Sequence, residues 1–501
     1  MAKQRNRNRN NNGHSNNKSL EYQRFASVSA IKNSSSSASS ASSITETRLK
    51  TMLKDPQSNA TQIANLSKSM KQVNGIYKRI IRYFSSLLTY DHTIFPVMDN
   101  PFAFAEDPTA MQEEFAQTAI FVDSLNPKFN LPMIAEKLFT NGAVFLYKLQ
   151  DSKSVAYQEL PLTFCRIGYI DQGVYRYQMD VSKIQESTLE YYPKEIQSAY
   201  ASYQNGATDK FIEGKWYEVS DKGVAFTLDT DALTQNGASL PPLANALIDA
   251  IKIENAKEDM ENTAQLDNTK IVHSKIETDE KGRPLMELPV VLEYHNALKR
   301  SLPDGSVAIT NPFDTSALSL NGTGKDGKFA LLDKSVEQLY DGAGVSKLLF
   351  AGDGASSQAL ERSIQVDAQW MYSFLLPMFT NYYNYELRKA GKKGTSWKIK
   401  FLEISHFDRQ DAITTAKDQL SYGGSRQEYL AYTGMTPLQV ANVLIFEQRV
   451  LNIDAIMIAK QTSYTQSGGD GAVADTSADA TAGAPESDDP TDTTTRIKDS
   501  Q

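Results

Sequence analysis

Apolar positions recur at helical spacing through a long stretch late in the chain. This stripe consists of six residues: Leu360, Ile364, Met371, Phe374, Leu375 and Met378. The spacing places them on one face, so we predict a single long helix that is buried along the stripe. Ser356 or Ser357 can cap its first turn, because a serine oxygen accepts a bond from an unpaired amide. Pro377 lies inside the pattern and predicts a kink, since proline lacks the amide that a helix interior uses.

The residues before this helix show a different pattern. Four glycines surround a short apolar run and a single lysine: Gly342, Gly344, Gly352 and Gly354 around Leu348, Leu349 and Phe350, with Lys347 in front of them. Glycine tolerates several backbone conformations, so we predict a mobile loop over residues 342–355. Its apolar residues favour burial against a neighbour or a ligand.

Earlier in the chain, helical and alternating patterns succeed one another. We predict helices over 63–88, 107–122, 131–140 and 193–203, and strands over 143–149, 154–160, 164–170, 174–180, 216–219 and 224–228. Pro241 and Pro242 predict the start of a longer helix that runs to about residue 270. One side of this helix is apolar, and its far half is acidic.

A compact mixed segment follows the acidic half of that helix. We predict a strand over 271–276, a helix over 288–299, a strand over 307–310 and a return helix that ends near residue 341. Beyond the long helix, the patterns predict a strand at 397–402 and three helices at about 408–420, 425–432 and 436–449. The predicted fold class is therefore α+β, with helices in the majority.

Composition limits the class of protein further. The 501 residues suffice for about two to four domains, and the formal net charge of −8 argues against an overall basic nucleic-acid binder. Residues 1–44, rich in Asn and Ser and basic, and residues 462–501, which are acidic, are predicted to be disordered tails. Cys165 is the only cysteine, which excludes an intrachain disulfide and favours a reducing compartment such as a cytoplasm. No apolar run predicts a membrane span, and the N-terminus lacks the features of a secretory signal.

Motifs that would indicate catalysis are weak. Gly322 to Lys328 has the glycine and lysine spacing of a phosphate-binding loop, but Phe329 stands where a Ser or Thr must hold magnesium. Asp229 and Asp231 resemble the start of a calcium loop that lacks its later ligands. The five histidines show no metal-ligand spacing. We therefore expect no enzymatic activity, no catalytic residues, no cofactor and no metal.

The order of elements resembles that of a tailed-bacteriophage portal protein. In that family, two stem helices flank a small clip, a channel loop follows, and a long kinked helix spans the wing. The resemblance extends over about residues 60–460 and implies these divisions: a wing at 45–240, stem helices at 241–270 and 328–341, a clip at 271–327, a channel loop at 342–355, the long wing helix and a strand at 356–405, and a helical crown at 406–461.

The resemblance also implies a function. The chain would form a ring, by family expectation a dodecamer, at one vertex of the virion capsid after assembly in the host cytoplasm. The ring would pass double-stranded DNA without sequence specificity during genome packaging and ejection. It would bind the terminase large subunit, the major capsid and scaffold proteins, and head–tail connector proteins, with no membrane involved. ATP hydrolysis would belong to the terminase.

Two sets of residues are the candidates for these roles. Channel-loop candidates that face DNA are Lys347, Leu349, Phe350, Gly352 and Gly354, and stem candidates for subunit contacts are Leu243, Leu247, Ile251 and Leu339. A structural linker in which Lys347 pairs with Asp341 or Asp353 remains open beside the DNA-contact role. At the level of the whole chain, the alternatives are a cytoplasmic scaffold or adaptor with disordered tails, and an enzyme whose site a single sequence does not reveal.

Overall fold

The computed structural model describes residues 45–97, 108–150, 155–234, 237–268, 270–279, 283–302, 306–311, 325–347, 349, 357–391 and 396–452. The two predicted tails, residues 1–44 and 462–501, therefore lie outside the described residues. None of the described helices is both long and apolar enough to cross a membrane.

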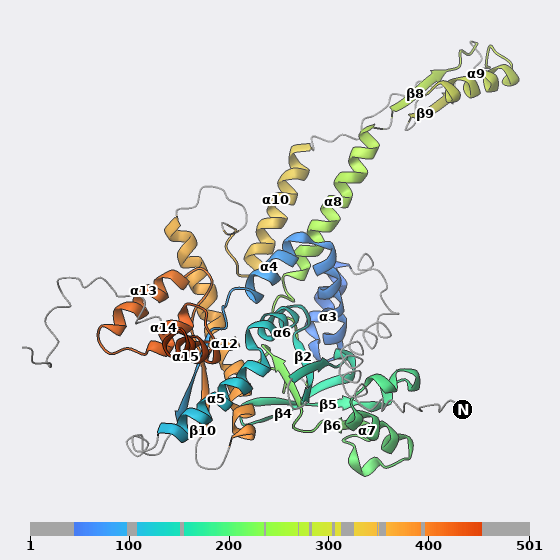
Figure 1. Cartoon of the computed structure of the whole chain (residues 1–501). Helices are drawn as coiled ribbons and strands as arrows, with labels where there is room; N and C mark the ends of the chain where they lie inside the picture. Colours follow the sequence, from blue (N-terminus) through green and yellow to red (C-terminus); the bar gives the residue numbers. More distant parts are fainter. Residues whose placement is uncertain are drawn as a thin grey trace, which may run out of the picture. The chain divides into compact units, whose positions relative to one another are not determined.

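Helices open the described chain and enclose its main core (Figure 1). They are α2 (Glu46–Lys54), α3 (Pro56–Val73), α4 (Gly75–Ser85), α5 (Pro108–Leu125) and α6 (Pro127–Asn141). The single helix predicted over 63–88 is wrong, because α3 ends before Asn74. That buried side chain accepts a bond from the Tyr77 amide at 2.8 Å and so caps a second helix, α4.

A six-stranded antiparallel sheet and the helices that pack on its two faces form the largest part of the structure, which we call the body. Its strands are β2 (Ala143–Gln150), β3 (Val155–Glu159), β4 (Cys165–Asp171), β5 (Val174–Asp180), β6 (Trp216–Glu218) and β7 (Gly223–Thr227). They lie in the order β3-β2-β7-β5-β4, and β6 pairs with β5. Helix α7 (Lys194–Gln204) and four short 3-10 helices (Leu162–Phe164, Val181–Lys183, Glu186–Tyr191 and Thr208–Lys210) interrupt this series. All six strands were predicted, but their order was not.

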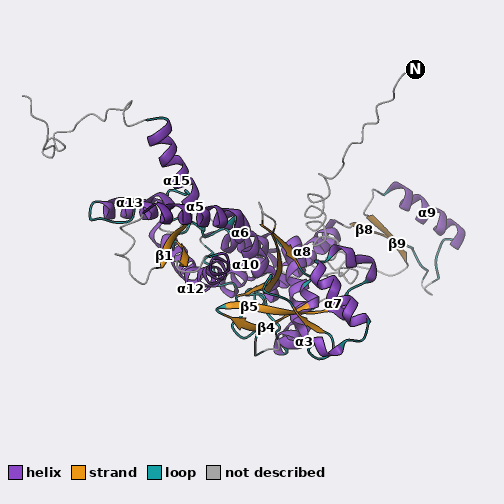
Figure 2. Ribbon diagram, turned by 60° about the horizontal axis from the view of Figure 1, so that its bottom comes forward, coloured by secondary structure: helices purple, strands orange, loops and turns teal. Residues whose placement is uncertain are grey.

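Side chains from the two faces of this sheet enter two different cores. Along β2, Val144 and Leu146 join the main core with the N-terminal helices, whereas Phe145 and Tyr147 join a second core that includes Ile196 of α7. Successive side chains of a strand point to opposite faces, so this alternation follows from the strand itself. Helices accordingly cover both faces of the sheet (Figure 2).

Two helices and a small module form the middle of the chain (Figure 1). Helix α8 (Leu247–Asn268) packs against α10 (Lys325–Gly342), and between them come β8 (Lys270–Lys275), α9 (Leu288–Ser301) and β9 (Ser306–Asn311). The predicted start of α8 at Pro241 is wrong. Residues 242–246 instead form tight turns, in which the Ala246 amide bonds the Leu243 carbonyl at 3.1 Å.

The long helix α12 (Ser357–Ala390) includes Pro377 in its interior, as predicted. The kink remains a prediction, and Ser356 lies outside the described residues. After α12, β10 (Ser396–Phe401) pairs antiparallel with β1 (His92–Val97), a strand that the sequence did not predict. Helices α13 (Arg409–Leu420), α14 (Arg426–Tyr432) and α15 (Pro437–Ile445) follow close to their predicted positions. Residues from Leu444 onward belong to a separate unit, which includes a π-helix at Phe446–Val450.

The architecture is mixed helix and sheet, which confirms the α+β class.

Candidate functional site

The four predicted stem residues come together, but inside the chain. Leu243, Leu247, Ile251 and Leu339 are all buried in the main core, together with residues from α3, α4 and α6. We predicted that a neighbouring subunit must cover this stripe, and that argument does not hold. The reason is that helices of the same chain cover the N-terminal half of α8 and the C-terminal half of α10. The local sequence pattern does not reveal this cover.

A buried asparagine anchors α8 to this core. Asn74 donates from its amide nitrogen to Glu254 Oε1 at 3.0 Å and to the Ala250 carbonyl at 3.5 Å. The same side chain caps α4, so one residue fixes α8 to the N-terminal helices. Beyond this point Glu258, Asp259 and Glu261 are exposed, so these acidic residues of α8 face solvent.

The segment after α10 begins with a helix stop. The Val345 amide bonds the Tyr340 carbonyl at 3.0 Å, and the Gly344 amide bonds the Asp341 carbonyl at 3.0 Å. Gly344 has φ = +69°, the left-handed conformation that this end motif requires. Val345 is buried in the main core. The first residues of the predicted channel loop are thus tied to the body.

Of the five predicted channel-loop residues, the structure describes two. Lys347 Nζ lies 2.7 Å from Glu337 Oε1 on α10, and this contact lowers the pKa of the Glu337 carboxyl. Leu349 is half-buried against the main core. Phe350, Gly352 and Gly354 lie outside the described residues. Lys347 therefore has an intrachain partner in Glu337, which we did not predict, and Asp353, one of the two partners that we predicted, lies outside the described residues.

A network that the sequence did not indicate holds the last turns of α12 on the sheet. Lys148 of β2 and Glu386 of α12 form a buried ion pair, with 7% and 2% of their side chains exposed. Next to it, the Tyr382 hydroxyl donates to that of Tyr157 at 2.9 Å, and Lys389 Nζ lies 2.6 Å from Asp221 Oδ2. No spacing within α12 identifies these partners, because β2 and β3 come more than two hundred residues earlier.

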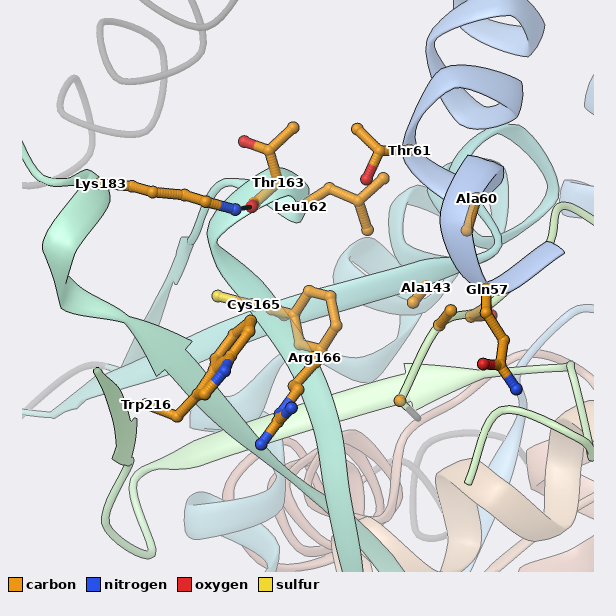
Figure 3. Close-up of a pocket in the computed structure, with 14 residues that line it drawn as sticks. Gln57, Ala60, Thr61, Ala143, Leu162, Thr163, Cys165, Arg166, Lys183 and Trp216 are labelled. Atoms are coloured by element: carbon orange, nitrogen blue, oxygen red, sulfur yellow. Dashed lines mark hydrogen bonds between the residues drawn. The ribbon is translucent and has the colours of Figure 1, made fainter. Parts of the chain in front are cut away.

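A small hollow beside the sheet has charged residues in its walls (Figure 3). It measures about 220 Å³, and Arg166 and Trp216 lie together at one end, with the guanidinium carbon 4.2 Å from the ring centre. Arg166 is already paired with Glu213 at 2.9 Å, and Lys183 donates to the Thr163 carbonyl at 2.5 Å. Burial raises the pKa of the Cys165 thiol, which makes it a poor nucleophile at neutral pH. The charged groups of this hollow therefore already have partners within the chain, which is typical of a structural surface and not of a reaction site.

Two further groups of polar residues have structural positions. Asp408 accepts bonds from the Ser405 amide and hydroxyl at 2.7 Å, so its carboxylate holds Ser405. Lys325 and Lys328 of the phosphate-loop pattern are in helix α10. Among the described residues, no group of three His, Cys, Asp or Glu side chains is placed to bind a metal.

No protein-family model matches this chain, and no curated protein matches its sequence. A similar solved chain belongs to a structure titled "Virion of native gene transfer agent (GTA) particle". The match covers 65% of this chain and 89% of that chain, at 13% sequence identity and a TM-score of 0.34. A superposition at this TM-score does not establish a common fold, so conclusions about function rest on the geometry of this chain.

Proposed function

We propose that this chain is a virion structural protein that forms a ring at one capsid vertex, and that the ring is a portal for double-stranded DNA. The observation that carries the proposal is the order α8, β8-α9-β9, α10, residues 343–356, α12. A paired stem, a separate small module and a long helix after a glycine-containing segment are the parts that a portal needs. The ring would be a closed, head-to-tail assembly, for which we expect twelve copies.

The small module, which would be the clip, supports this proposal through its surface. Its two strands pair in parallel, from Lys270 with Ser306 to Lys275 with Asn311. Parallel strands are normally covered on both faces, and a two-stranded sheet is marginal by itself. Around it, several large apolar side chains are exposed: Leu285, Met286, Leu288, Val290, Leu292 and Tyr294. A module of this kind gains stability from partners, which in a portal are neighbouring clips and the terminase large subunit.

Charge supports a conduit that does not grip DNA. The chain has a formal net charge of −8, and the C-terminal half of α8 exposes Glu258, Asp259 and Glu261. A basic lining would bind phosphates by counterion release and retain the duplex. Acidic or neutral walls let it move during packaging and ejection. In this proposal the chain has no catalytic residues, needs no cofactor and leaves ATP hydrolysis to the terminase.

The remaining partners follow from the position of a portal in a virion. Capsid and scaffold proteins would contact the outside of the ring, and head–tail connector proteins would bind the clip after the terminase leaves. A cytoplasmic scaffold or adaptor is the second candidate function. Its recruiting tails would be residues 1–44 and 462–501, which lie outside the described residues.

Electron microscopy of the purified full chain in negative stain tests the proposal directly. We expect rings with an axial hole. A chain that stays monomeric at every concentration would contradict a portal and favour the adaptor.

Variants of the Lys347–Glu337 pair test the channel role. If Lys347 contacts passing DNA, Lys347→Ala particles should package shortened or poorly retained genomes, whereas Glu337→Gln particles should be normal. If the lysine only holds the segment to α10, both variants should behave alike, because each removes the same ion pair. Genome length in purified particles is the measurement.

A further inference from the structure

The outer face of α12 is apolar although it faces solvent. Val366, Trp370 and Phe374 follow one another at one-turn spacing, and 70%, 37% and 49% of each is exposed. The opposite face, with Ile364, Met371 and Leu375, lies in the main core. The sequence placed Phe374 in the buried stripe, and this prediction is wrong. Helix α12 therefore has two apolar faces, and the described part of the chain covers one of them.

This outer face also lacks charge. Between Arg362 and Glu386 the only charged residue is Asp367, and it is buried and accepts a bond from the Tyr83 hydroxyl at 2.8 Å. The other exposed residues between the apolar ones are Gln365, Gln369 and Ser373. Aromatic side chains without charged neighbours are typical of the centre of a protein–protein interface.

The charge pattern restricts what can cover this face. Nucleic acid is held by Lys and Arg that neutralise phosphates, and helices that lie on membranes carry several Lys and Arg on their polar side. Between Val366 and Phe374, α12 has neither Lys nor Arg. The complementary surface is therefore an uncharged, apolar protein surface.

We infer that the face formed by Val366, Trp370 and Phe374 binds a second copy of this chain. The inference rests on the proposed ring and specifies one of its subunit contacts. The area of the face supports this partner. Its three side chains expose roughly 300 Å² together, given the size of such residues, whereas a stable interface takes about 800 Å² from each partner. This face is therefore too small to form a stable contact by itself, and in the proposed ring the exposed apolar residues of the clip module would supply further contact area to the neighbouring copy.

The first test replaces exposed residues of this face by lysine in the full chain. Phe374→Lys and Val366→Lys place a charge in the contact, while Trp370 is left intact because it packs on Phe84 and Phe139. Tyr422→Lys is the matched control, since Tyr422 is 93% exposed in the turn after α13. Light scattering gives the mass of the assembly, and circular dichroism checks that each variant is folded.

We expect rings from the wild type and from Tyr422→Lys, and loss of the ring-sized species in the two α12 variants with their helix content retained. Intact rings in Phe374→Lys would overturn the contact and leave the portal proposal standing. A wild type that forms closed pairs, lost in Phe374→Lys, would keep the contact and overturn the ring. A wild type that is always monomeric would overturn both.

A labelling experiment answers the question if the lysine variants do not fold. Cys165 is buried and its raised pKa makes it unreactive, so an introduced cysteine can be labelled selectively. In assembled particles, a cysteine at Ser373→Cys should react more slowly than one at Ser421→Cys, which is exposed outside this face. Equal rates would overturn the contact. Protection that requires added DNA or lipid vesicles would overturn it as well, in favour of that ligand.

Discussion

The body and the clip module use apolar residues in opposite ways. In the body, Leu247 and Leu339 from the two stem helices are buried among residues of α3, α4 and α6. In the clip, Leu288 is 71% exposed, and Leu292 and Tyr294 on the same helix are also exposed. Both regions contain helices with similar apolar content. Only the body has enough chain around it to cover them.

This contrast shows which apolar surfaces are available to a neighbour. A stripe that the chain already covers contributes to folding, and a change there affects every copy before assembly begins. An uncovered stripe contributes little to the fold of one copy and becomes stabilising only in the assembly. Substitutions in the two regions should therefore separate folding from association.

The largest effect is expected for Leu247→Asp in the body. Truncating a buried leucine costs about 2–5 kcal/mol, and an unpaired buried charge adds to that cost. We therefore expect the chain to unfold or aggregate, with loss of helix by circular dichroism. A folded monomer that merely fails to assemble would show that the stripe belongs to a subunit interface, and would break the comparison.

A slightly smaller loss is expected when the buried pair on α12 is broken. Glu386→Gln leaves the Lys148 ammonium buried without its partner, which costs about 3–5 kcal/mol. Replacing both residues together, Lys148→Met with Glu386→Leu, should recover most of that stability. Glu428→Gln is the matched control, because its exposed pair with Lys400 contributes at most about 1 kcal/mol. Urea unfolding gives the free energy of unfolding of the wild type and of the three variants. Equal losses for Glu386→Gln and Glu428→Gln would contradict the conclusion that the Lys148–Glu386 pair is buried and stabilising.

Acid should weaken the body through His92. Burial lowers the pKa of His92 to about 4, from 6.5 in an unfolded chain. The unfolded state then binds a proton that the folded state refuses, so stability falls as the pH drops from about 6.5 towards 4. The loss reaches about 3 kcal/mol from this residue. In His92→Gln the free energy of unfolding should depend less on pH across this window, and an unchanged slope would refute the prediction.

The smallest effect on folding is expected in the clip. Leu288→Ser with Leu292→Ser changes exposed positions, so the free energy of unfolding of a single copy should shift by less than about 0.5 kcal/mol for each substitution. Assembly or terminase binding should nevertheless weaken, because these residues are the uncovered apolar surface of α9. Thermal unfolding and sedimentation of the same samples separate the two effects. A large drop in thermal stability would mean that Leu288 and Leu292 are core residues.

Much of the fold was predictable because its signals are local. The strand patterns of β2 to β7 and the apolar spacing in α12 each appear within about twenty residues, and the structure has these elements close to the predicted bounds. The division between α3 and α4 was missed because the apolar period continues across Asn74. Its cause is a buried asparagine whose partners, Ala250 and Glu254, come much later in the chain.

The candidate site was predictable to a smaller extent. The sequence placed Lys347 after α10 and identified the four stem residues as apolar. It also predicted α10, the small module and most of α8, whose start it placed too early. It did not indicate that Glu337 pairs with Lys347, or that Lys148 and Tyr157 hold the end of α12. These contacts join residues from different elements, and no periodicity within one element encodes its partner.

The sequence by itself determined most of the helix and strand segments, because backbone propensity and apolar spacing act over a few residues. Only the tertiary structure decided which apolar faces are covered. Leu247 and Phe374 look alike in their local patterns, yet one is buried and the other is half exposed. Burial depends on which distant segments pack on a face, and that is set by the whole chain.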